Sequence, residues 1–175
     1  MQKLKIALLS YRSAPFSGGQ GIFVRELSKA LTKRGHKVDV ISGPPMPILD
    51  SGIGLIKLEG LNLFETFNFK DRVKKLWNKK NKNRLDYYDF FKTLIGGFPE
   101  MYSFGERAKE YLLKGKDYDI ILDNQSLSLG MLEIQKKYPF IEIIHHPITK
   151  DFKYDLIYSN GIIQRFFKKR WYSFL

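Results

Sequence analysis

The sequence predicts an α/β protein in which a doubly wound parallel sheet forms a single domain. Short apolar runs, typical of strands buried on both faces of a parallel sheet, alternate along the chain with segments of helical periodicity. The first part of the chain contains a strand, a glycine-rich loop, a helix and a second strand within about forty residues, the length of a βαβ unit. A chain of 175 residues with 43% hydrophobic residues is long enough for one such domain and short for two.

The first βαβ unit is the clearest of these signals. Residues 4–10 form a nearly continuous apolar run, which predicts a central strand. After a loop rich in Ser, Pro and Gly, apolar residues recur at helical spacing over 22–34, and Gly35 provides a C-terminal cap. Residues 38–41 then predict the second strand, and the prolines that follow it require irregular backbone.

The remaining elements continue the alternation of strands and helices. Strands are expected at residues 53–58, 118–123 and 141–144, and helices at 108–113, 127–138 and 161–175. One or two further helices are expected between residues 61 and 98, in a basic and aromatic stretch. The pattern of the last helix stops at Leu175 without a cap or turn residue, so we expect this helix to be truncated.

Composition restricts the classes of function and the compartment. The absence of cysteine excludes disulfides, thiolate metal sites and cysteine nucleophiles, and it suits a reducing compartment. No apolar run approaches the roughly 18 residues of a membrane-spanning helix. The N-terminus has the basic flank and the short apolar stretch of a secretory signal, but no small-residue cleavage site follows them. A strand and a cytoplasmic location are therefore expected.

Ligands of doubly wound sheets bind outside the carboxyl ends of the strands, and a glycine loop follows the first strand. In Ser17-Gly18-Gly19-Gln20-Gly21, free backbone N–H groups and the helix dipole would form an anion site. A flexible turn before an ordinary helix is the alternative. The spacing matches neither the P-loop nor the dinucleotide G-x-G-x-x-G motif, and Ser42-Gly43-Pro44 stands where NAD-binding folds need an acidic residue. NAD binding is therefore disfavoured.

Three stretches together resemble a known family. They are residues 16–27 (FSGGQGIFVREL), residues 34–43 (RGHKVDVISG) and residues 144–149 (IHHPIT). A glycine pair followed by an apolar helix and by Gly-His-x-Val-x-Val is similar to the GT-B glycosyltransferases of the family-4 type, which transfer a sugar from a nucleotide-sugar with retention. The resemblance spans nearly the whole chain, although residues 70–101 carry no motif of the family.

The resemblance implies that residues 1–175 are the N-terminal, Rossmann-like domain of a GT-B enzyme, the half that holds a sugar or lipid-linked acceptor. Gly18, Gly19 and Gln20 would contact the donor diphosphate. In the family, a second Rossmann-like domain carries the nucleotide pocket and a pair of glutamates. Both are missing here, so the chain alone is expected to be inactive. No cofactor is implied, because the nucleotide-sugar donor is a substrate.

The resemblance also implies that His145 or His146 contacts the transferred sugar or its reacting centre. Both residues directly follow the predicted strand 141–144, where a neutral imidazole can hydrogen-bond a sugar hydroxyl. Because successive strand residues face opposite sides, only one of the pair should face the crevice, and we favour His145. The alternative is that one of them bonds the backbone and caps the strand. His36, in a helix-to-strand turn, is expected to be structural.

The polar tripeptide Asp123-Asn124-Gln125 ends another predicted strand. Asn124 and Gln125 are expected to bind acceptor hydroxyls; the alternative is that Asp123 or Asn124 caps the following helix. Asp117-Tyr118-Asp119 mimics the metal-binding D-x-D of a different glycosyltransferase fold, but it precedes its strand and so falls at the wrong end of the sheet. The spacing of His and carboxylate residues suggests no metal site.

The net charge of +12 implies attraction to anionic partners, namely nucleic acid, anionic lipid or phosphorylated substrates. The expected anionic-surface set is Lys74, Lys75, Trp77, Lys79 and Lys80. Such a segment can lie on an anionic membrane at the inner face, bind nucleic acid by stacking, or be a solvated helix whose aromatics pack on the domain. Membrane is favoured over nucleic acid. The alternative to a transferase is a non-catalytic basic α/β module that binds either partner.

Overall fold

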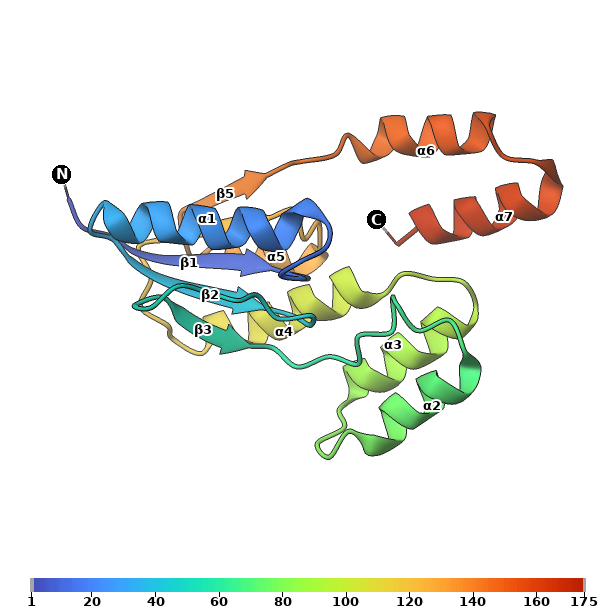
Figure 1. Cartoon of the computed structure of the whole chain (residues 1–175), viewed down its shortest axis with the longest axis horizontal. Helices are drawn as coiled ribbons and strands as arrows, with labels where there is room; N and C mark the ends of the chain where they lie inside the picture. Colours follow the sequence, from blue (N-terminus) through green and yellow to red (C-terminus); the bar gives the residue numbers. More distant parts are fainter. Residues whose placement is uncertain (1, 175) are drawn as a thin grey trace.

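The computed structural model describes residues 2–174 and contains one all-parallel sheet (Figure 1). Its strands are β1 (Lys5–Ser10), β2 (Lys37–Ser42), β3 (Gly54–Lys57), β4 (Ile120–Asn124) and β5 (Phe140–Ile143), in the order β3-β2-β1-β4-β5. The five predicted strands and the α/β class are confirmed. Strand order reverses between β1 and β4, so the loops that follow these two strands diverge and leave a crevice at their carboxyl ends.

Helices cover both faces of the sheet, and successive side chains of β1 point alternately to one face and the other. Ile6 and Leu8 join a core cluster with Val24 of α1 (Gly19–Lys33). Ala7 and Leu9 join a second cluster, on the face covered by α4 (Glu100–Leu113) and α5 (Leu129–Ile134). The continuous apolar run of β1 thus serves two cores, as expected for the central strand of a parallel sheet.

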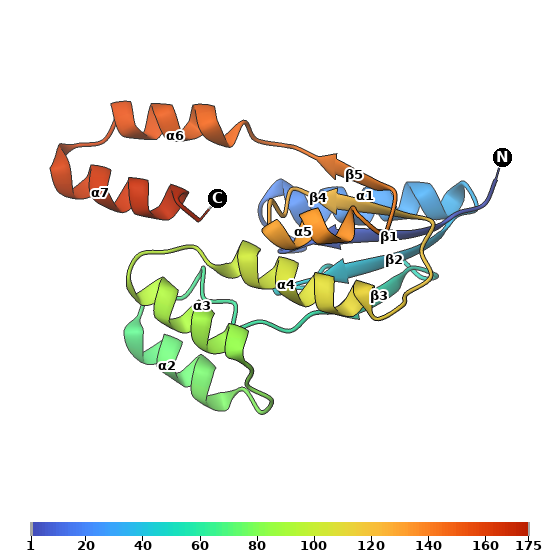
Figure 2. The ribbon, with the colours of Figure 1, turned by 180° about the vertical axis from the view of Figure 1, so that it is seen from behind.

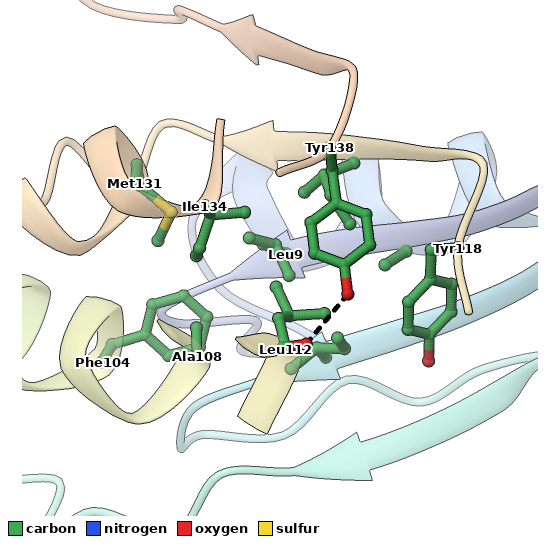
Figure 3. Close-up of a cluster of buried hydrophobic side chains, with 11 residues drawn as sticks. Leu9, Phe104, Ala108, Leu112, Tyr118, Met131, Ile134 and Tyr138 are labelled. Carbon is green, nitrogen blue, oxygen red and sulfur yellow. Dashed lines mark hydrogen bonds between the residues drawn. The ribbon is translucent and has the colours of Figure 1, made fainter. Parts of the chain in front are cut away.

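The core under α4 and α5 is shown in Figure 3, where Leu9 lies among Phe104, Leu112 and Ile134. The Tyr138 hydroxyl donates to the carbonyl of Leu112 at 2.9 Å, which closes this core with a satisfied polar group. The two helices cross closely, because a Cβ at Gly105 would collide with the Ser128 side chain. Glycine is needed at this position for the backbones to approach.

The stretch between β3 and α4 forms a helical hairpin of α2 (Phe69–Asn78) and α3 (Arg84–Leu94), which lies beside α4 (Figures 1 and 2). Asn68 accepts from the N–H of Lys70 at the start of α2, and Asn83 forms a capping box with Asp86 at the start of α3. These caps explain why two helices form in a stretch with little apolar periodicity.

Three helices depart from the expected pattern. α4 begins at Glu100, well before residue 108, and α5 ends at Ile134 rather than residue 138. α6 (Ile148–Ile157) was not predicted. The predicted last helix is α7 (Gly161–Tyr172), and Leu175 lies outside the described residues.

α6 and α7 form a pair set apart from the sheet (Figures 1 and 2). Asp155 of α6 accepts from Lys168 at 2.7 Å and from the Tyr172 hydroxyl at 3.0 Å, which joins the two helices. The Trp171 ring of α7 stacks on Phe98 with 5.4 Å between the ring centroids, and this contact attaches the helix pair to the body of the domain. Among residues 2–174, no helix has both the length and the apolar character needed to cross a bilayer.

Candidate functional site

Three cavities lie at the carboxyl ends of β1, β4 and β5, and His146 lines all of them. The first, of about 370 Å³, adjoins the glycine loop. The second, of about 250 Å³, is walled mainly by aromatic rings. The third, of about 610 Å³, opens between the β5–α6 connection and α7. The site therefore lies at the place that the strand order of the sheet predicts.

The glycine loop forms one wall of the first cavity, which Ser17, Gly18, Gly19 and Gln20 line. α1 begins at Gly19, and no side chain caps its first turn. Its first N–H groups and the positive end of the helix dipole are therefore available to an anion. A Cβ added at Gly19 meets no atom within 4 Å, whereas one at Gly21 would collide with the carbonyl of Ala14. Gly19 leaves room for a ligand, and Gly21 allows the helix to pack on the loop.

Arg12 is a residue of this wall that the sequence reasoning missed. Its side chain lines the same cavity and is 11% exposed. One Nη atom lies 2.8 Å from Glu65 Oε1, and the guanidinium lies 4.1 Å from the centre of the Phe64 ring. These contacts fix the guanidinium beside the start of α1, next to the Glu65 carboxylate, which lines the same cavity. Its position two residues after β1 was the available signal, because strand ends of this fold face the ligand.

The two histidines have different surroundings. His145 Nε2 lies 2.6 Å from Asn124 Oδ1, and its ring meets Phe23 edge-on at 4.7 Å. With the amide of Asn124 oriented this way, Nε2 carries the proton. His146 lines the three cavities. The structure therefore places His146, and not the favoured His145, in the lining of these cavities; β5 ends at Ile143, so strand alternation no longer applies two residues later.

Comparison with known proteins gives the family. The family model described as Glycosyltransferase Family 4 matches residues 17–175, which include the glycine loop and both histidines. The chain belongs to glycosyltransferase family 4. A protein from Mycolicibacterium hassiacum, named MMP alpha-(1->4)-mannosyltransferase, is 37% identical over 179 aligned residues that cover 98% of this chain. The chain spans 42% of the length of that relative.

In this family-4 domain, Asn124 and Gln125 hold the histidine segment. Asn124 is fully buried, and its Nδ2 donates to Ser10 Oγ at 3.3 Å while its Oδ1 faces His145. Gln125 Oε1 accepts the N–H groups of His145 at 2.7 Å and His146 at 3.1 Å. Both side chains thus position the histidines, and binding of acceptor hydroxyls stays a prediction. The helix cap expected at Asp123 or Asn124 is supplied by Ser128, which accepts from the N–H of Gly130.

The second cavity has the size of a sugar ring and aromatic walls. Tyr11, Phe64, Phe98 and Trp171 line it, together with the polar groups of Gln20, Gln125 and Asp151. Phe98 contacts three of these rings, at centroid distances of 6.1 Å from Tyr11, 5.2 Å from Phe64 and 5.4 Å from Trp171. Burial raises the pKa of the Tyr11 hydroxyl, which keeps it a neutral hydrogen-bonding group.

A carboxyl pair, with one member fully buried and the other half-buried, lies on the two strands that precede the histidine segment and Gln125. Asp123 and Glu142 are register partners on β4 and β5. Asp123 Oδ2 accepts from the N–H of Ser126 at 2.8 Å, while Asp123 Oδ1 and Glu142 Oε1 are buried without a partner. Burial, and then the neighbouring Asp123 carboxylate, raise the pKa of Glu142 to about 8. Because burial raises the pKa of both carboxyl groups and the Asp123 carboxylate further disfavours ionisation of Glu142, we expect the pair to hold one proton at neutral pH.

The other predicted positions lie outside the crevice. The D-x-D segment is at the amino end of the sheet, where Asp119 Oδ2 accepts from the N–H of Lys5 at 2.6 Å. His36 Nδ1 accepts from the N–H of Leu4 at 3.2 Å, a structural contact as predicted. The anionic-surface set is divided, because Lys75 and Lys79 turn inward to carbonyl and carboxylate oxygens. Lys74, Trp77 and Lys80 are exposed.

Proposed function

We propose that this chain is the acceptor-side domain of a retaining GT-B glycosyltransferase that uses a nucleotide-sugar donor. One observation carries the proposal: the uncapped N-terminus of α1, the Arg12 guanidinium and the His146 side chain line a single cavity at the crevice of a family-4 domain. A helix N-terminus beside a fixed guanidinium suits a diphosphate, and an adjacent imidazole suits the sugar attached to it.

The chemistry follows from where charge develops. When the bond between the sugar and the diphosphate breaks, negative charge gathers on the leaving phosphate oxygens. The N–H groups at Gly19 and Gln20 and the charge of Arg12 stabilise that anion, and they stabilise it most when it is fully formed. Because loop and guanidinium are already held in place, little reorganisation is needed at the moment of reaction.

His146 is the histidine proposed to meet the transferred sugar. Its side chain is exposed in the crevice, and its backbone is held on both sides by Gln125. A neutral imidazole can accept from one sugar hydroxyl and so orient the reacting carbon. His145 is proposed to hold the segment in place through Asn124 rather than to touch the sugar.

The aromatic cavity is proposed as the place of the acceptor. It shares Gln20, Phe64 and His146 with the glycine-loop cavity, so an acceptor there would lie next to the transferred sugar. Flat rings bind the apolar face of a sugar, and the amides of the two glutamines suit its hydroxyl groups. The nucleotide would be held by the part of the protein that corresponds to the rest of the longer relative.

The test is sugar transfer by the chain extended through its natural downstream sequence, with a panel of UDP-, GDP- and ADP-sugars. The relative's name makes mannosyl donors the first to try. Gly19→Asp places a carboxylate where the diphosphate is proposed to bind and should lower kcat/KM by at least about 100-fold. Ser51→Asp is the control, because it adds the same charge at an exposed turn residue before β3, at the opposite end of the sheet.

Two outcomes would contradict the proposal. Transfer that survives Gly19→Asp at the level of Ser51→Asp would remove the phosphate role of the glycine loop. Measurable transfer by purified residues 1–175 alone would remove the dependence on the remainder of the protein, since most of the donor site is proposed to lie there.

A further inference from the structure

Helix α2 shows the reverse of the usual pattern of a surface helix, because basic side chains face the domain and most of its apolar side chains face solvent. Its basic side chains Arg72, Lys75 and Lys79, spaced to share one helical face, point toward the domain. Arg72 donates to the carbonyl of Thr66 at 2.5 Å, and Lys75 donates to the carbonyl of Asn62 at 2.5 Å. The helix is therefore docked on the domain mainly by cations and carbonyl oxygens, together with the apolar side chain of Leu76.

Leu76 of α2 packs against the core cluster of Leu61, Leu63 and Phe90, but the other apolar side chains of the helix point away from the domain. Phe69, Val73 and Trp77 are spaced four residues apart, so they form one stripe along the helix, and Phe67 directly precedes it. Phe67 is 86% exposed, Phe69 59% and Trp77 80%, and no side chain of α2 is buried. At about 1.5 Å of rise per residue, the stripe is a ridge roughly 12 Å long. Such a ridge of large rings in water marks an interaction surface.

Lysines accompany the ridge along its length. Lys70, Lys74 and Lys80 are exposed, and none of them forms an ion pair within residues 2–174. Asp71 is the sole acidic residue of the helix. An apolar ridge that carries a tryptophan and is flanked by free lysines has the composition of a helix that lies in the interface of an anionic bilayer. The charge of the whole chain, +12, has the same sign as these lysines.

We propose that the outward face of α2 binds an anionic lipid surface, with Phe67, Phe69 and Trp77 among the acyl chains and Lys70, Lys74 and Lys80 at the headgroups. Val73, at the centre of the ridge, favours lipid over single-stranded nucleic acid, because a valine offers no ring on which a base can stack. The proposal is independent of sugar transfer, so its test needs no donor or acceptor.

The chain contains two tryptophans, which makes a site-specific test available. In the Trp171→Phe variant, Trp77 is the remaining tryptophan, and a phenylalanine keeps a ring against Phe98. The variant is mixed with vesicles of phosphatidylcholine alone or of phosphatidylcholine with phosphatidylglycerol, and Trp77 emission is recorded. The expected result is a blue shift, with quenching by brominated acyl chains, on the anionic vesicles only.

Charge variants test the lysines. Lys70→Glu combined with Lys74→Glu should weaken binding to the anionic vesicles at least about 25-fold, since each lysine near such a surface contributes about five-fold. Lys33→Glu combined with Lys37→Glu, on exposed lysines at the end of α1 and the start of β2, is the matched double control and should weaken binding far less.

Three results would overturn the proposal. They are unchanged Trp77 emission on anionic vesicles even though the protein sediments with them, equal binding to neutral vesicles, and a Trp77 response to single-stranded oligonucleotide but not to lipid. The first would place the lipid contact elsewhere on the chain, and the last would assign the ridge to nucleic acid.

Discussion

The side-chain amide of Gln125 pairs with the backbone of His146 through two hydrogen bonds, as a second peptide group would. Its Oε1 accepts the N–H of His146 at 3.1 Å, and its Nε2 donates to the carbonyl of the same residue at 2.9 Å. Gln125 itself has a positive φ of 52° and is 3% exposed. A side chain held this firmly fixes where the imidazole of His146 can point.

The first prediction concerns this pairing. Gln125→Glu keeps the acceptor oxygens but loses the donor to the His146 carbonyl, so the imidazole should shift within the crevice. In the active, extended protein, kcat should fall by about 100-fold, the usual effect of a small misplacement, while the donor KM changes little. Gln135→Glu, at the end of α5, is the control. Equal loss in both variants, or loss confined to KM, would argue against a positioning role.

The glycine loop gives a second prediction. Gly21→Ala should lower the free energy of unfolding by about 1–3 kcal/mol, because the new Cβ collides with the Ala14 carbonyl and the backbone must shift. Gly19→Ala should change it by less than about 0.5 kcal/mol, since its Cβ enters open space. Urea unfolding of both variants measures the difference. The same destabilisation in each would show that the loop does not pack as described.

A third prediction is a pH dependence from the Asp123 and Glu142 pair. The folded-state pKa of Glu142, about 8, lies above its ordinary value of 4.5. The folded chain therefore holds a proton that the unfolded chain has lost, and this contribution to stability is complete below about pH 4.5 and is lost as pH rises through about 8. The Glu142→Gln variant has no ionisable group at this position. As pH rises from about 5 to about 9, its melting temperature should therefore increase relative to that of the original chain.

Thermal unfolding across that range measures the effect. Glu133→Gln is the control, because Glu133 is exposed and its partner Lys136 lowers the pKa of its carboxyl. Its difference from the original chain should stay flat above about pH 5. Parallel curves for Glu142→Gln and the original chain would mean that the pair does not share a proton.

The fourth prediction concerns the attachment of the α2–α3 hairpin to α4. Arg107 is 9% exposed and lies 2.9 Å from Asp86 and 3.4 Å from Asp89, both buried. Arg107→Met leaves these carboxylates short of positive charge and should lower the free energy of unfolding by about 3–5 kcal/mol. The double variant Arg107→Met, Asp89→Asn should lose less than the single one. Urea unfolding decides, and additive losses would contradict the coupling.

Prediction from sequence succeeded where one physical signal dominated. The strands β1, β2 and β4 are buried on both faces, so their apolar runs are unmistakable, and the glycine loop is placed by the strand before it. The resemblance to the family rests on the glycine loop, on the turn and strand of residues 34–43, and on the histidine stretch 144–149. The start of α4 was missed because its first turns pack through Met101 and Phe104 in a segment that also carries polar residues. α6 was not predicted because its first residues, after Pro147, fall within the histidine stretch 144–149 that carries the resemblance to the family.

The details of the site depend on contacts between distant segments, which periodicity does not report. Asn124 and Gln125 were expected to bind a ligand, but their partners lie about twenty residues further along the chain. Lys75 and Lys79 were expected on the surface, but carbonyl and carboxylate oxygens of the domain bind them. Whether a polar side chain serves a ligand or the protein is decided by what the fold brings beside it.

The stability of α2 depends little on that of the sheet, because most of the apolar side chains of α2 face solvent. A helix that buries no side chain gains little from the hydrophobic effect, so opening it requires much less free energy than unfolding the two cores of the domain. Its amide protons are expected to exchange with solvent before those of α1 or β1. Substitutions in the exposed ridge can therefore change the surface to which the domain binds. The same substitutions leave the free energy of unfolding of the sheet and the crevice almost unchanged.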